Sequence, residues 1–374
     1  MEREFVSGSI AIAEGALDAG CRFFAGYPIT PASQVLEYMA REMPKVGGTF
    51  IQAEDEIAAI NMVIGASWAG VKAMTATSGP GFSLMQEGLG LAIITETPVV
   101  IVNAMRIGPS TGIPTKAGQG DVMQARWGSH GHYEIVVYAP YSIQEAYDYI
   151  IKSFNIAEAL RTPVILLSDA LLMNLHELLI RKRREIKIIS RKKPTCKPEE
   201  YKPYRADEDL VPPMATFGEG FRVFVESLIH DENGYYDEKS YKTLVTRLSQ
   251  KIIKNKNIIV DYELKIKPES RILLVAYGSL ARSVKEFVLE KWCKGEFTYG
   301  LLRPISLWPS FIHDIKQQLQ SIEKVIVFEM NLGQYSLEVE RALRGKEVYF
   351  VPWLHIDIPS PEEVDELIIE TLKR

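Results

Sequence analysis

The sequence predicts an α/β fold in which a doubly wound domain is followed by a second, smaller α/β domain. Short runs rich in Val, Ile and Leu alternate with helical stretches from residue 10 to about residue 172, and the alternation returns from residue 271. Between these regions, a basic stretch and then a proline-rich stretch interrupt the pattern. Such alternation is typical of a parallel sheet covered by helices. At roughly 100–200 residues per domain, the 374 residues have room for two or three domains.

Turn residues bound the elements of the first domain. A helix over residues 10–19 is ended by Gly20, and a short strand over residues 21–25 leads into the turn Gly26-Tyr27-Pro28, because glycine and proline stop regular structure. Three further runs are compact and apolar, as buried parallel strands are: residues 71–76, 99–104 and 164–167.

A change of composition marks the end of this domain. Residues 181–193 contain eight basic residues and one acid, and residues 194–213 are rich in proline and charge. Since no aromatic residues alternate with the charges, a solvated linker or a face toward an acidic partner chain is favoured over a polyanion-binding patch. An amphipathic helix is expected at residues 240–254, within an excursion between the two domains.

The second domain begins with a strand at residues 272–276, followed by the turn Tyr277-Gly278-Ser279 and a helix. Later strands are expected at residues 324–328 and 347–351. The predicted organisation is therefore a first domain over residues 1–180, a linker or excursion over residues 181–267, and a second domain over residues 268–374.

The composition excludes several classes of protein. Apolar residues at 47% and charged residues at 24% argue against disorder, and a net charge of −5 gives no reason to expect nucleic acid as a partner. The first residues carry acids where a signal peptide needs basic residues, and no apolar run approaches the ~18 residues of a membrane span, so a cytoplasmic protein without a membrane partner is expected. Three separated cysteines, Cys21, Cys196 and Cys293, are too few for a four-thiolate iron–sulfur cluster, so any metal cluster is expected on another chain.

Glu54-Asp55-Glu56 precedes an apolar run that predicts a helix buried on nearly every face. Acids at a helix N-terminus complement the helix dipole, and this ordinary role would account for all three. A carboxylate at the mouth of a buried helix can also be desolvated, which raises its proton affinity and suits it to proton exchange with a bound heterocycle.

Two further segments follow predicted strands. Thr75-Ala76-Thr77-Ser78-Gly79-Pro80-Gly81 forms a tight turn near the carboxyl edge of the sheet, where α/β proteins bind ligands, although a plain turn is an equal alternative. Arg106 follows the strand at residues 99–104 and is trailed by hydroxyl groups, so it could bind a carboxylate there. His130-Gly131-His132 lacks a third ligand nearby, and both histidines are interpreted as structural or as polar groups that support a site from outside.

On these motifs the chain resembles the alpha subunit of the 2-oxoacid:ferredoxin oxidoreductases, most of all the 2-oxoglutarate type. The resemblance extends over almost the whole chain. The segments that carry it are residues 26–31, residues 52–62, residues 77–81, residues 108–112 with Pro114-Thr115, Gln119-Gly120-Asp121, and residues 329–334. It implies a first domain of the thiamine diphosphate-binding, pyrimidine-binding type and a second domain like the C-terminal domain of transketolases.

The resemblance also assigns roles. Glu56, nine residues before Gly65 and fifty before Arg106, corresponds to the family's catalytic glutamate, which hydrogen-bonds the aminopyrimidine ring of the cofactor. Thr30 and Arg106 correspond to positions that hold the oxoacid carboxylate. The loop with Ser110, Thr111 and Thr115 lines the substrate pocket in 2-oxoglutarate-type members. Further cofactor contacts are expected from Ser78 and Gly79.

Half of a thiamine diphosphate site is missing from this sequence. It has no Gly-Asp-Gly motif with an Asn-rich segment downstream, which in thiamine enzymes binds the diphosphate and Mg²⁺. The family places that half, with a [4Fe-4S] cluster, on a beta subunit, so the resemblance implies an active site between two chains and no activity from this chain alone. Separate gamma and delta subunits are additional partners that the resemblance allows.

The implied function is oxidative decarboxylation of 2-oxoglutarate to succinyl-CoA, with coenzyme A as acyl acceptor and ferredoxin as electron acceptor, in either direction. One alternative keeps the chemistry and changes the substrate to pyruvate or a branched-chain 2-oxoacid. A second alternative is a non-catalytic scaffold subunit, against which the retention of Glu56 and Arg106 argues. A nicotinamide-dependent dehydrogenase is disfavoured because no dinucleotide-binding fingerprint occurs.

Overall fold

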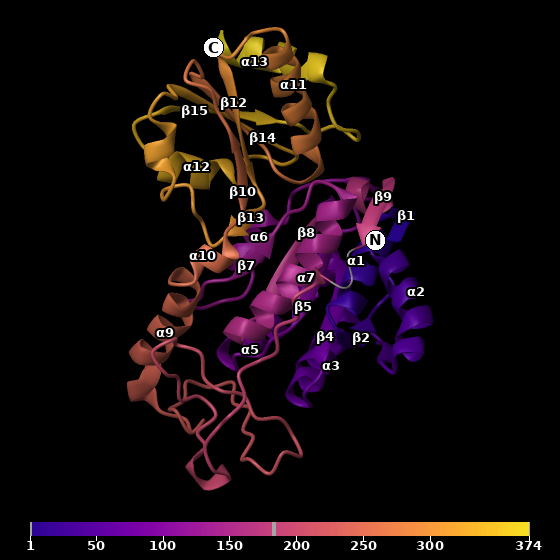
Figure 1. The fold of residues 1–374 in the computed structure, drawn as a ribbon, viewed down its shortest axis with the longest axis vertical. Coiled ribbons are helices and arrows are strands. Elements are labelled where there is room, and N and C mark those ends of the chain that lie inside the picture. The colour runs from indigo at the N-terminus through magenta and orange to yellow at the C-terminus, as the bar shows by residue number, and fades with distance from the viewer. Residues whose placement is uncertain (1, 182–184, 374) are drawn as a thin grey trace.

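A central, mainly parallel sheet organises the first part of the chain. The computed structural model describes residues 2–181 and 185–373 (Figure 1). The strand order in this sheet is β13-β7-β8-β5-β4-β2-β3, and β13 is antiparallel to β7. The strands are β2 (Cys21–Gly26), β3 (Thr49–Gln52), β4 (Lys72–Ser78), β5 (Val100–Ile107), β7 (Val136–Tyr138), β8 (Val164–Asp169) and β13 (Ser306–Trp308). The strands predicted in this region are confirmed within one or two residues at most ends, with β4 and β5 running further toward their carboxyl ends.

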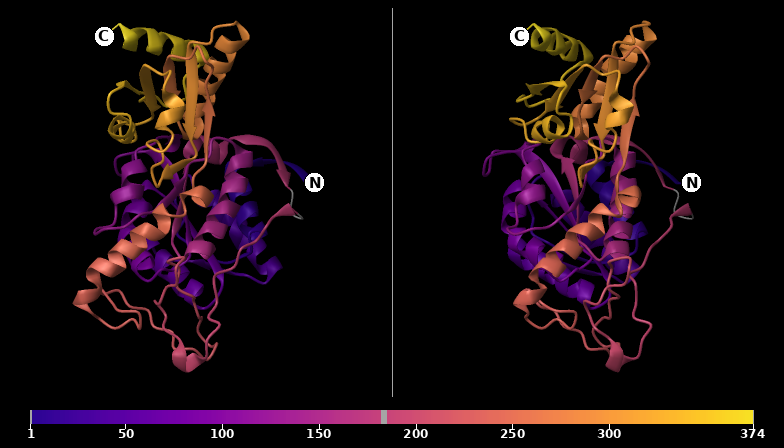
Figure 2. Two further views of the ribbon diagram at one scale, coloured as in Figure 1. Left: turned by 60° about the vertical axis from the view of Figure 1, so that its left-hand side comes forward. Right: turned by 90° about the vertical axis from the view of Figure 1, so that its left-hand side faces the viewer.

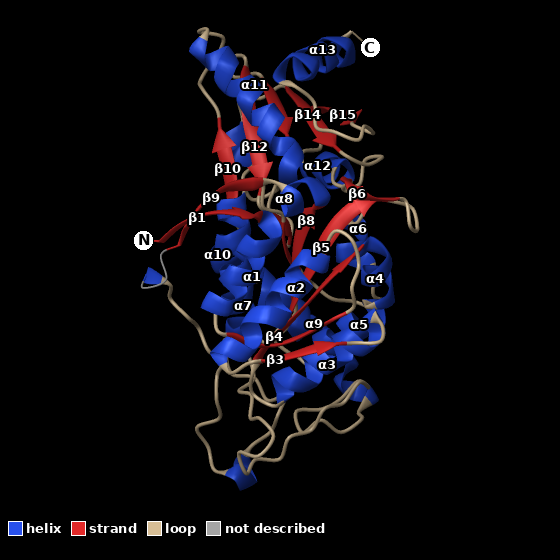
Figure 3. Cartoon of the chain, turned by 90° about the vertical axis from the view of Figure 1, so that its right-hand side faces the viewer, coloured by secondary structure: helices blue, strands red, loops and turns tan. Residues whose placement is uncertain are grey.

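Helices cover both faces of this sheet, and each face has its own hydrophobic core. One face carries α1 (Gly8–Asp18), α2 (Ser33–Glu42) and α7 (Ile143–Leu160). The other carries α3 (Glu56–Trp68), α4 (Gly79–Leu84), α5 (Gln86–Ile94) and α6 (Val122–Trp127) (Figure 3). The central strands β4, β5 and β8 are buried along almost their whole length, which explains why their sequences are continuous apolar runs rather than alternating ones.

A second, mixed sheet builds the C-terminal part, with strand order β10-β12-β11-β14-β15. Its strands are β10 (Tyr262–Lys265), β11 (Ile272–Val275), β12 (Tyr299–Pro304), β14 (Lys324–Glu329) and β15 (Glu347–Pro352). The strands predicted at residues 272–276, 324–328 and 347–351 are β11, β14 and β15. Helices α11 (Ala281–Cys293) and α13 (Pro361–Leu372) pack together, while α12 (Ser336–Ala342) contacts β14 and β15.

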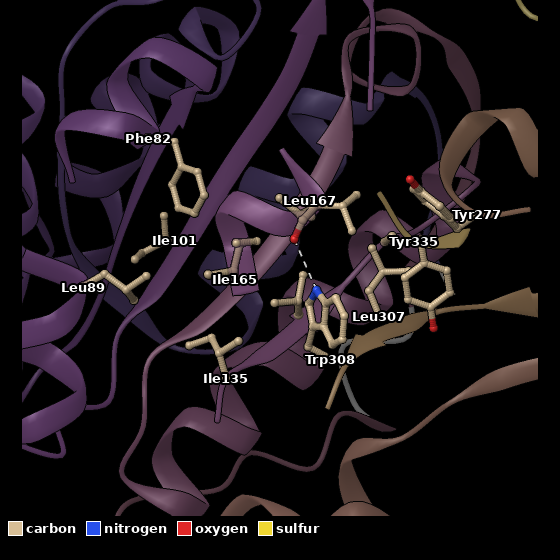
Figure 4. Packing of buried hydrophobic residues seen from close by; sticks show 14 of the residues in the cluster. Phe82, Leu89, Ile101, Ile135, Ile165, Leu167, Tyr277, Leu307, Trp308 and Tyr335 are labelled. Atoms are coloured by element: carbon tan, nitrogen blue, oxygen red, sulfur yellow. Dashed lines mark hydrogen bonds between the residues drawn. The ribbon is translucent and has the colours of Figure 1, made fainter. Parts of the chain in front are cut away.

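The two sheets are joined by more than a linker. β10 lies before residue 268, in the predicted linker, yet it pairs with β12 of the second sheet. β13 lies after residue 268, in the predicted second domain, yet it pairs with β7 of the first sheet. Trp308 of β13 and Tyr335 belong to the same hydrophobic cluster as Phe82, Ile101 and Leu167 (Figure 4). The divisions at residues 180 and 267 stay a prediction, but the second sheet is firmly packed on the first.

Smaller elements complete the chain. β1 (Glu2–Ser7) and β9 (His176–Arg181) form an antiparallel pair that the sequence analysis did not predict. β6 (Ile113–Ala117) pairs with the end of β5, and α8 (Ala170–Asn174) follows β8. Among the described residues, no helix combines the length and the apolar character that crossing a membrane requires.

The excursion after β9 extends along the first domain, away from the second domain (Figures 1 and 2). It ends in α9 (Tyr241–Ile253), which confirms the helix expected at residues 240–254, and α10 (Lys256–Ile259). Arg161, at the end of α7, is fully buried and donates to the carbonyl oxygens of Pro203 and Pro213 at 3.0 and 3.1 Å. The excursion is therefore anchored to the first domain through buried hydrogen bonds.

The basic stretch is partly internal rather than solvated. Arg181 forms ion pairs with Glu14 and Asp18. Arg191 is 6% exposed and contacts Glu158 at 2.6 Å. For these two arginines the interpretation as a solvated linker was wrong, because acids of α1 and α7 neutralise them inside the chain. Residues 182–184 of this stretch lie outside the described residues.

A buried ion cluster ties α9 to the first domain and gives a stability prediction. Glu96 is 0% exposed and contacts Lys251 and Arg247 at 2.6 Å each. Burial opposes ionisation of Glu96, but the two cations outweigh burial and lower its pKa to about 2. We expect Glu96→Gln to lower the free energy of unfolding by about 3–5 kcal/mol, because two buried cations lose their partner. Urea unfolding measures this change. Glu37→Gln, at an exposed position, is the control and should change the free energy of unfolding by no more than about 0.5 kcal/mol.

The same cluster predicts a pH dependence. In an unfolded chain the pKa of a glutamate is ~4.3, which is higher than the pKa of Glu96 in the folded chain. The ion pairs therefore contribute their full stabilisation at pH values above the unfolded pKa. This contribution, about 3 kcal/mol by linkage, is lost as the pH falls from about 4.5 to about 2. The stability difference between wild type and Glu96→Gln should therefore shrink across that window. A difference that is constant with pH would contradict this role of the carboxylate.

Candidate active site

The carboxyl ends of β4, β5 and β8 meet at one edge of the first sheet. Ser78, Ala104 and Ser168 lie side by side there, as the register of the three strands shows. Ligand sites of open α/β sheets form outside this edge, because the loops that leave the strands converge on it. The turn into α4, the residues after β5 and the start of α3 all lie around it.

Glu56 is the first residue of α3 and is 4% exposed. Asp55 caps this helix by accepting a hydrogen bond from the backbone N–H of Ala58 at 2.7 Å. Glu54 is exposed. Burial, and to a lesser degree the charge of Asp55, raise the pKa of the Glu56 carboxyl. The three acids therefore differ in role, and Glu56 is the one whose carboxylate is withdrawn from water.

Gly81 closes one side of the Glu56 carboxylate. A β-carbon at this position would overlap with Thr77 Oγ1 and Glu56 Oε1, so only glycine fits without moving one of them. The turn Ser78-Gly79-Pro80-Gly81 is thus more than a connection between β4 and α4, because its glycine packs directly on the candidate catalytic group.

This contact gives a second prediction. We expect Gly81→Ala to displace Glu56 and to cost about 1–3 kcal/mol of stability through overpacking. Activity of the assembled enzyme should fall at least about tenfold, since a small misplacement of a catalytic group is costly. Thermal unfolding of the chain measures the loss of stability, and turnover of the complex measures the loss of activity. Gly65→Ala is the control, because open space surrounds that position. A fully active Gly81→Ala complex would contradict the packing argument.

Asn103 and Asp121 lie on the other side of the turn. Asn103 is fully buried in β5 and donates from Nδ2 to Asp121 Oδ2 at 2.9 Å. A β-carbon on Gly79 would lie 3.3 Å from the same oxygen. Burial raises the pKa of Asp121, while the hydrogen bond from Asn103 and the positive charge of Arg106 counteract this rise. Asp121 therefore packs beside the Gly79 turn, and the charge of Arg106 favours its ionised form.

Arg106 is near the end of β5 and is 8% exposed. Its Nη1 donates to the backbone carbonyl of Thr30 at 2.7 Å, which brings together the two residues that the sequence analysis assigned to the substrate carboxylate. Thr30 itself is exposed. The site thus offers a buried guanidinium that is fixed at one nitrogen and an exposed hydroxyl residue beside it.

Ser110, Thr111 and Thr115 lie in the hairpin between β5 and β6 and are exposed. Ser110 has a positive φ of 56°, and Gly112 follows with a φ of 53°. The Gly112 α-carbon approaches the Ile107 carbonyl so closely that a β-carbon would overlap with it. The hairpin is therefore tightly wound, and no hydrogen bond to another described residue fixes its hydroxyl groups.

Several polar atoms at the edge are buried without a hydrogen-bond partner among the described residues. They include Ser78 Oγ, Asn103 Oδ1 and Arg106 Nε. Buried polar groups are nearly always paired, so unpaired ones that cluster at a sheet edge indicate a ligand or ordered water. This observation favours the ligand alternative for the 75–81 turn over the plain turn.

The two histidines of residues 130–132 lie elsewhere. His130 and His132 are exposed and line a largely apolar cavity of about 350 Å³ with Leu91 of α5 and Leu248 of α9. In the described part of the chain, no group of three or more His, Cys, Asp and Glu side chains is placed to hold a metal ion.

Sequence reasoning missed Asn103 and gave Asp121 no role. Asn103 is a lone amide in the apolar run Val100-Ile101-Val102-Asn103-Ala104, and a polar residue inside a buried strand costs free energy unless it has a partner. That signal was available. The sequence did not show that Asp121 is the partner of Asn103, because the two residues are eighteen positions apart.

Comparison with known proteins shows the family of this chain. The family described as "Pyruvate flavodoxin/ferredoxin oxidoreductase, thiamine diP-bdg" matches residues 14–250, and the family described as "Pyruvate:ferredoxin oxidoreductase core domain II" matches residues 270–357. The chain belongs to the alpha subunits of the 2-oxoacid:ferredoxin oxidoreductases. Both the predicted fold class and the predicted family are confirmed.

Among the relatives of this alpha-subunit chain is the 2-oxoglutarate synthase subunit KorA of Methanocaldococcus jannaschii, 50% identical over 372 residues that make up 99% of this chain and 100% of that protein. The ketoisovalerate oxidoreductase subunit VorB of Methanothermobacter thermautotrophicus is 36% identical over 94% of this chain and 93% of that protein.

Two solved structures resemble the fold. The 2-oxoglutarate:ferredoxin oxidoreductase of Magnetococcus marinus, with 2-oxoglutarate, coenzyme A and succinyl-CoA bound, has a TM-score of 0.91 and 32% identity. It covers 99% of this chain, which spans 65% of the length of that chain. A split-gene transketolase, an inactive beta4 tetramer, has a TM-score of 0.54 and 12% identity over 98% of this chain and 96% of that one, which shows a shared fold alone.

The residues at the sheet edge fit the thiamine diphosphate that the matched family binds. An aminopyrimidine ring needs a buried carboxylate and a polar wall, and Glu56 together with the unpaired Ser78 and Asn103 atoms supplies both. Gly81 packs against the Glu56 carboxylate without a side chain of its own.

Proposed function

We propose that this chain is the alpha subunit of an enzyme that oxidatively decarboxylates 2-oxoglutarate to succinyl-CoA, with ferredoxin as electron acceptor, in either direction. The observation that carries the proposal is the withdrawn Glu56 carboxylate, with its raised pKa, at the same sheet edge as the Thr30–Arg106 pair. Four relatives named as 2-oxoglutarate synthase subunits, 44–50% identical, and the Magnetococcus enzyme with 2-oxoglutarate bound support the choice of substrate.

Each residue of the site has a role in this proposal. Thiamine diphosphate, when bound, supplies an electron sink for the carbanion that decarboxylation leaves. Glu56 hydrogen-bonds the aminopyrimidine ring and holds the proton that this ring nitrogen exchanges, a role to which its raised pKa is suited. Ser78 and Gly79 form the neighbouring wall of the cofactor site.

The substrate is held by the other group of residues. Arg106 pairs with the oxoacid carboxylate through the guanidinium nitrogens that Thr30 leaves open, and the Thr30 hydroxyl adds a donor. Ser110, Thr111 and Thr115 face the rest of the substrate from the hairpin. These are positioning and electrostatic contributions, made by groups that the fold fixes before the substrate arrives.

A second chain completes the site in this proposal. The helix α3 was expected to be buried on nearly every face, yet Ile57 and Met62 are 50% and 38% exposed. Leu84 of α4 and Trp127 of α6 are also exposed, at 49% and 57%. These exposed apolar residues lie on three helices that cover the same face of the sheet, and exposed apolar surface of this kind marks interfaces. A beta subunit with the diphosphate site, Mg²⁺ and a [4Fe-4S] cluster is the occupant we propose, and gamma and delta subunits are further partners.

A substrate panel tests this function. We expect the complex of this chain with its partner subunits to reduce a low-potential viologen dye with 2-oxoglutarate at a kcat/KM at least about tenfold above those for pyruvate and 2-oxoisovalerate. A preference for 2-oxoisovalerate would instead support the branched-chain alternative, which the VorB relative at 36% identity represents. If the complex oxidised no 2-oxoacid at all, the alternative of a non-catalytic scaffold subunit would be favoured.

A further inference from the structure

The segment Gln119–Met123, here called the 119–123 segment, connects β6 of the first domain to α6, yet the second domain holds it. Gln119 is fully buried. Its backbone N–H donates to the Met330 carbonyl at 3.0 Å, and its side-chain oxygen accepts from the Met330 N–H at 3.1 Å. Its side-chain nitrogen donates to the Tyr277 carbonyl at 3.0 Å. With a further hydrogen bond that its carbonyl accepts from Asn331, this one residue of the first domain makes four hydrogen bonds to the second.

Gln334 binds the segment on both sides of Asp121. Its Nε2 donates to the Gly120 carbonyl at 2.6 Å, and its Oε1 accepts from the Met123 N–H at 2.9 Å. Trp308 donates from its indole nitrogen to the Val122 carbonyl at 3.3 Å (Figure 4). Every residue that flanks Asp121 in this segment therefore has a partner from the C-terminal part of the chain.

The residues of the second domain that bind this segment are themselves held in place by hydrogen bonds. Glu329 is fully buried and accepts from the Tyr277 hydroxyl at 2.7 Å and from Asn331 Nδ2 at 2.8 Å. Asn331 also donates to the Gln119 carbonyl at 2.8 Å and accepts from the Gln334 N–H at 3.0 Å. A network in which each polar group is paired forms a rigid support.

The group that this support places in the site is Asp121. Its carboxylate contacts Asn103, lies 3.3 Å from where a β-carbon on Gly79 would be, and interacts electrostatically with Arg106. Within the 119–123 segment, Asp121 thus lies beside the candidate cofactor wall and within the electrostatic influence of Arg106.

We propose that the second domain acts as a positioning element for the active site, in which Gln334 holds the 119–123 segment so that the Asp121 carboxylate is fixed against Asn103 and the Gly79 turn, where its charge acts on Arg106. The inference rests on the proposed function and assigns a catalytic purpose to a domain that contributes none of the candidate substrate or cofactor contacts. Gln334 is a positioning residue, because it acts through Asp121.

A double-mutant cycle in the assembled complex tests this coupling. Gln334→Ala removes both hydrogen bonds beside Asp121, and Asp121→Asn removes the charge while keeping an oxygen that accepts from Asn103. We expect each to lower kcat/KM for 2-oxoglutarate about 10- to 100-fold. The double variant should be no less active than Asp121→Asn alone, because coupled residues do not add. Gln318→Ala, which removes a contact to Tyr262 in the same domain, is the control and should leave activity unchanged.

Hydrogen exchange supplies a readout that does not depend on turnover. In the Gln334→Ala complex the amides of residues 120–123 should exchange at least about tenfold faster, while those of β11 stay protected. Effects that add in the cycle, or amides 120–123 that remain as protected as in wild type, would overturn the inference. If wild type itself oxidises no 2-oxoacid, the proposed function fails instead, and the two failures are thereby distinguished.

Discussion

Replacing Glu56 with glutamine should lower kcat of the assembled complex at least about 100-fold, because general acid–base groups contribute roughly 10²–10⁴-fold. Glutamine has the size of glutamate but cannot take up or release the proton. Glu56 is 4% exposed at the start of a capped helix. A glutamine of the same shape fits this buried position, so the substitution removes the proton exchange alone.

The measurement is oxoacid-dependent viologen reduction, made with complexes whose composition and cofactor content match those of wild type. Glu54→Gln is the matched control, because Glu54 is exposed two positions earlier, and it should keep full activity. If the Glu56→Gln complex turned over at the wild-type rate, the assignment of Glu56 as the catalytic group would be wrong.

Replacing Arg106 with lysine should lower kcat/KM for 2-oxoglutarate about 100-fold, chiefly through a higher KM. Lysine keeps the charge, but it cannot donate to the Thr30 carbonyl and to a carboxylate in the same planar arrangement. The Arg106 Nε, which has no hydrogen-bond partner among the described residues, would be lost as well.

Steady-state kinetics with 2-oxoglutarate measure this effect, and Arg41→Lys on the exposed surface of α2 is the control. A KM that stays at the wild-type value in Arg106→Lys would show that the substrate carboxylate binds elsewhere. A similar fall for every 2-oxoacid tested would confirm that Arg106 binds the carboxylate they share.

The alternation of apolar runs and helices was enough to predict the doubly wound sheet, because parallel strands that are buried on both faces have little freedom in composition. It could not predict β13 or the β1–β9 pair. Three residues, Ser306–Trp308, leave the second domain to pair with β7, and a segment this short has no pattern of its own. β1 depends on a partner about 170 residues away in the chain.

The same limit applies to the site. Glu56 and Arg106 were found because each sits in a distinctive motif, and their roles stay predictions until they are tested. Asp121 became visible only through Asn103, Gly79 and the network around Gln334, which join three separate parts of the sequence. The exposed face of α3 was also hidden, because an apolar helix that packs on a partner chain has the same composition as one buried in its own.

Reconstitution tests the central claim most directly. Viologen reduction with 2-oxoglutarate and coenzyme A would be measured for this chain alone, for the partner subunits alone, and for their mixture with thiamine diphosphate and Mg²⁺. We expect activity in the mixture only, because the proposed function places half of the site on each side. Activity from either component alone, or none from a mixture shown to contain its clusters and cofactor, would contradict it.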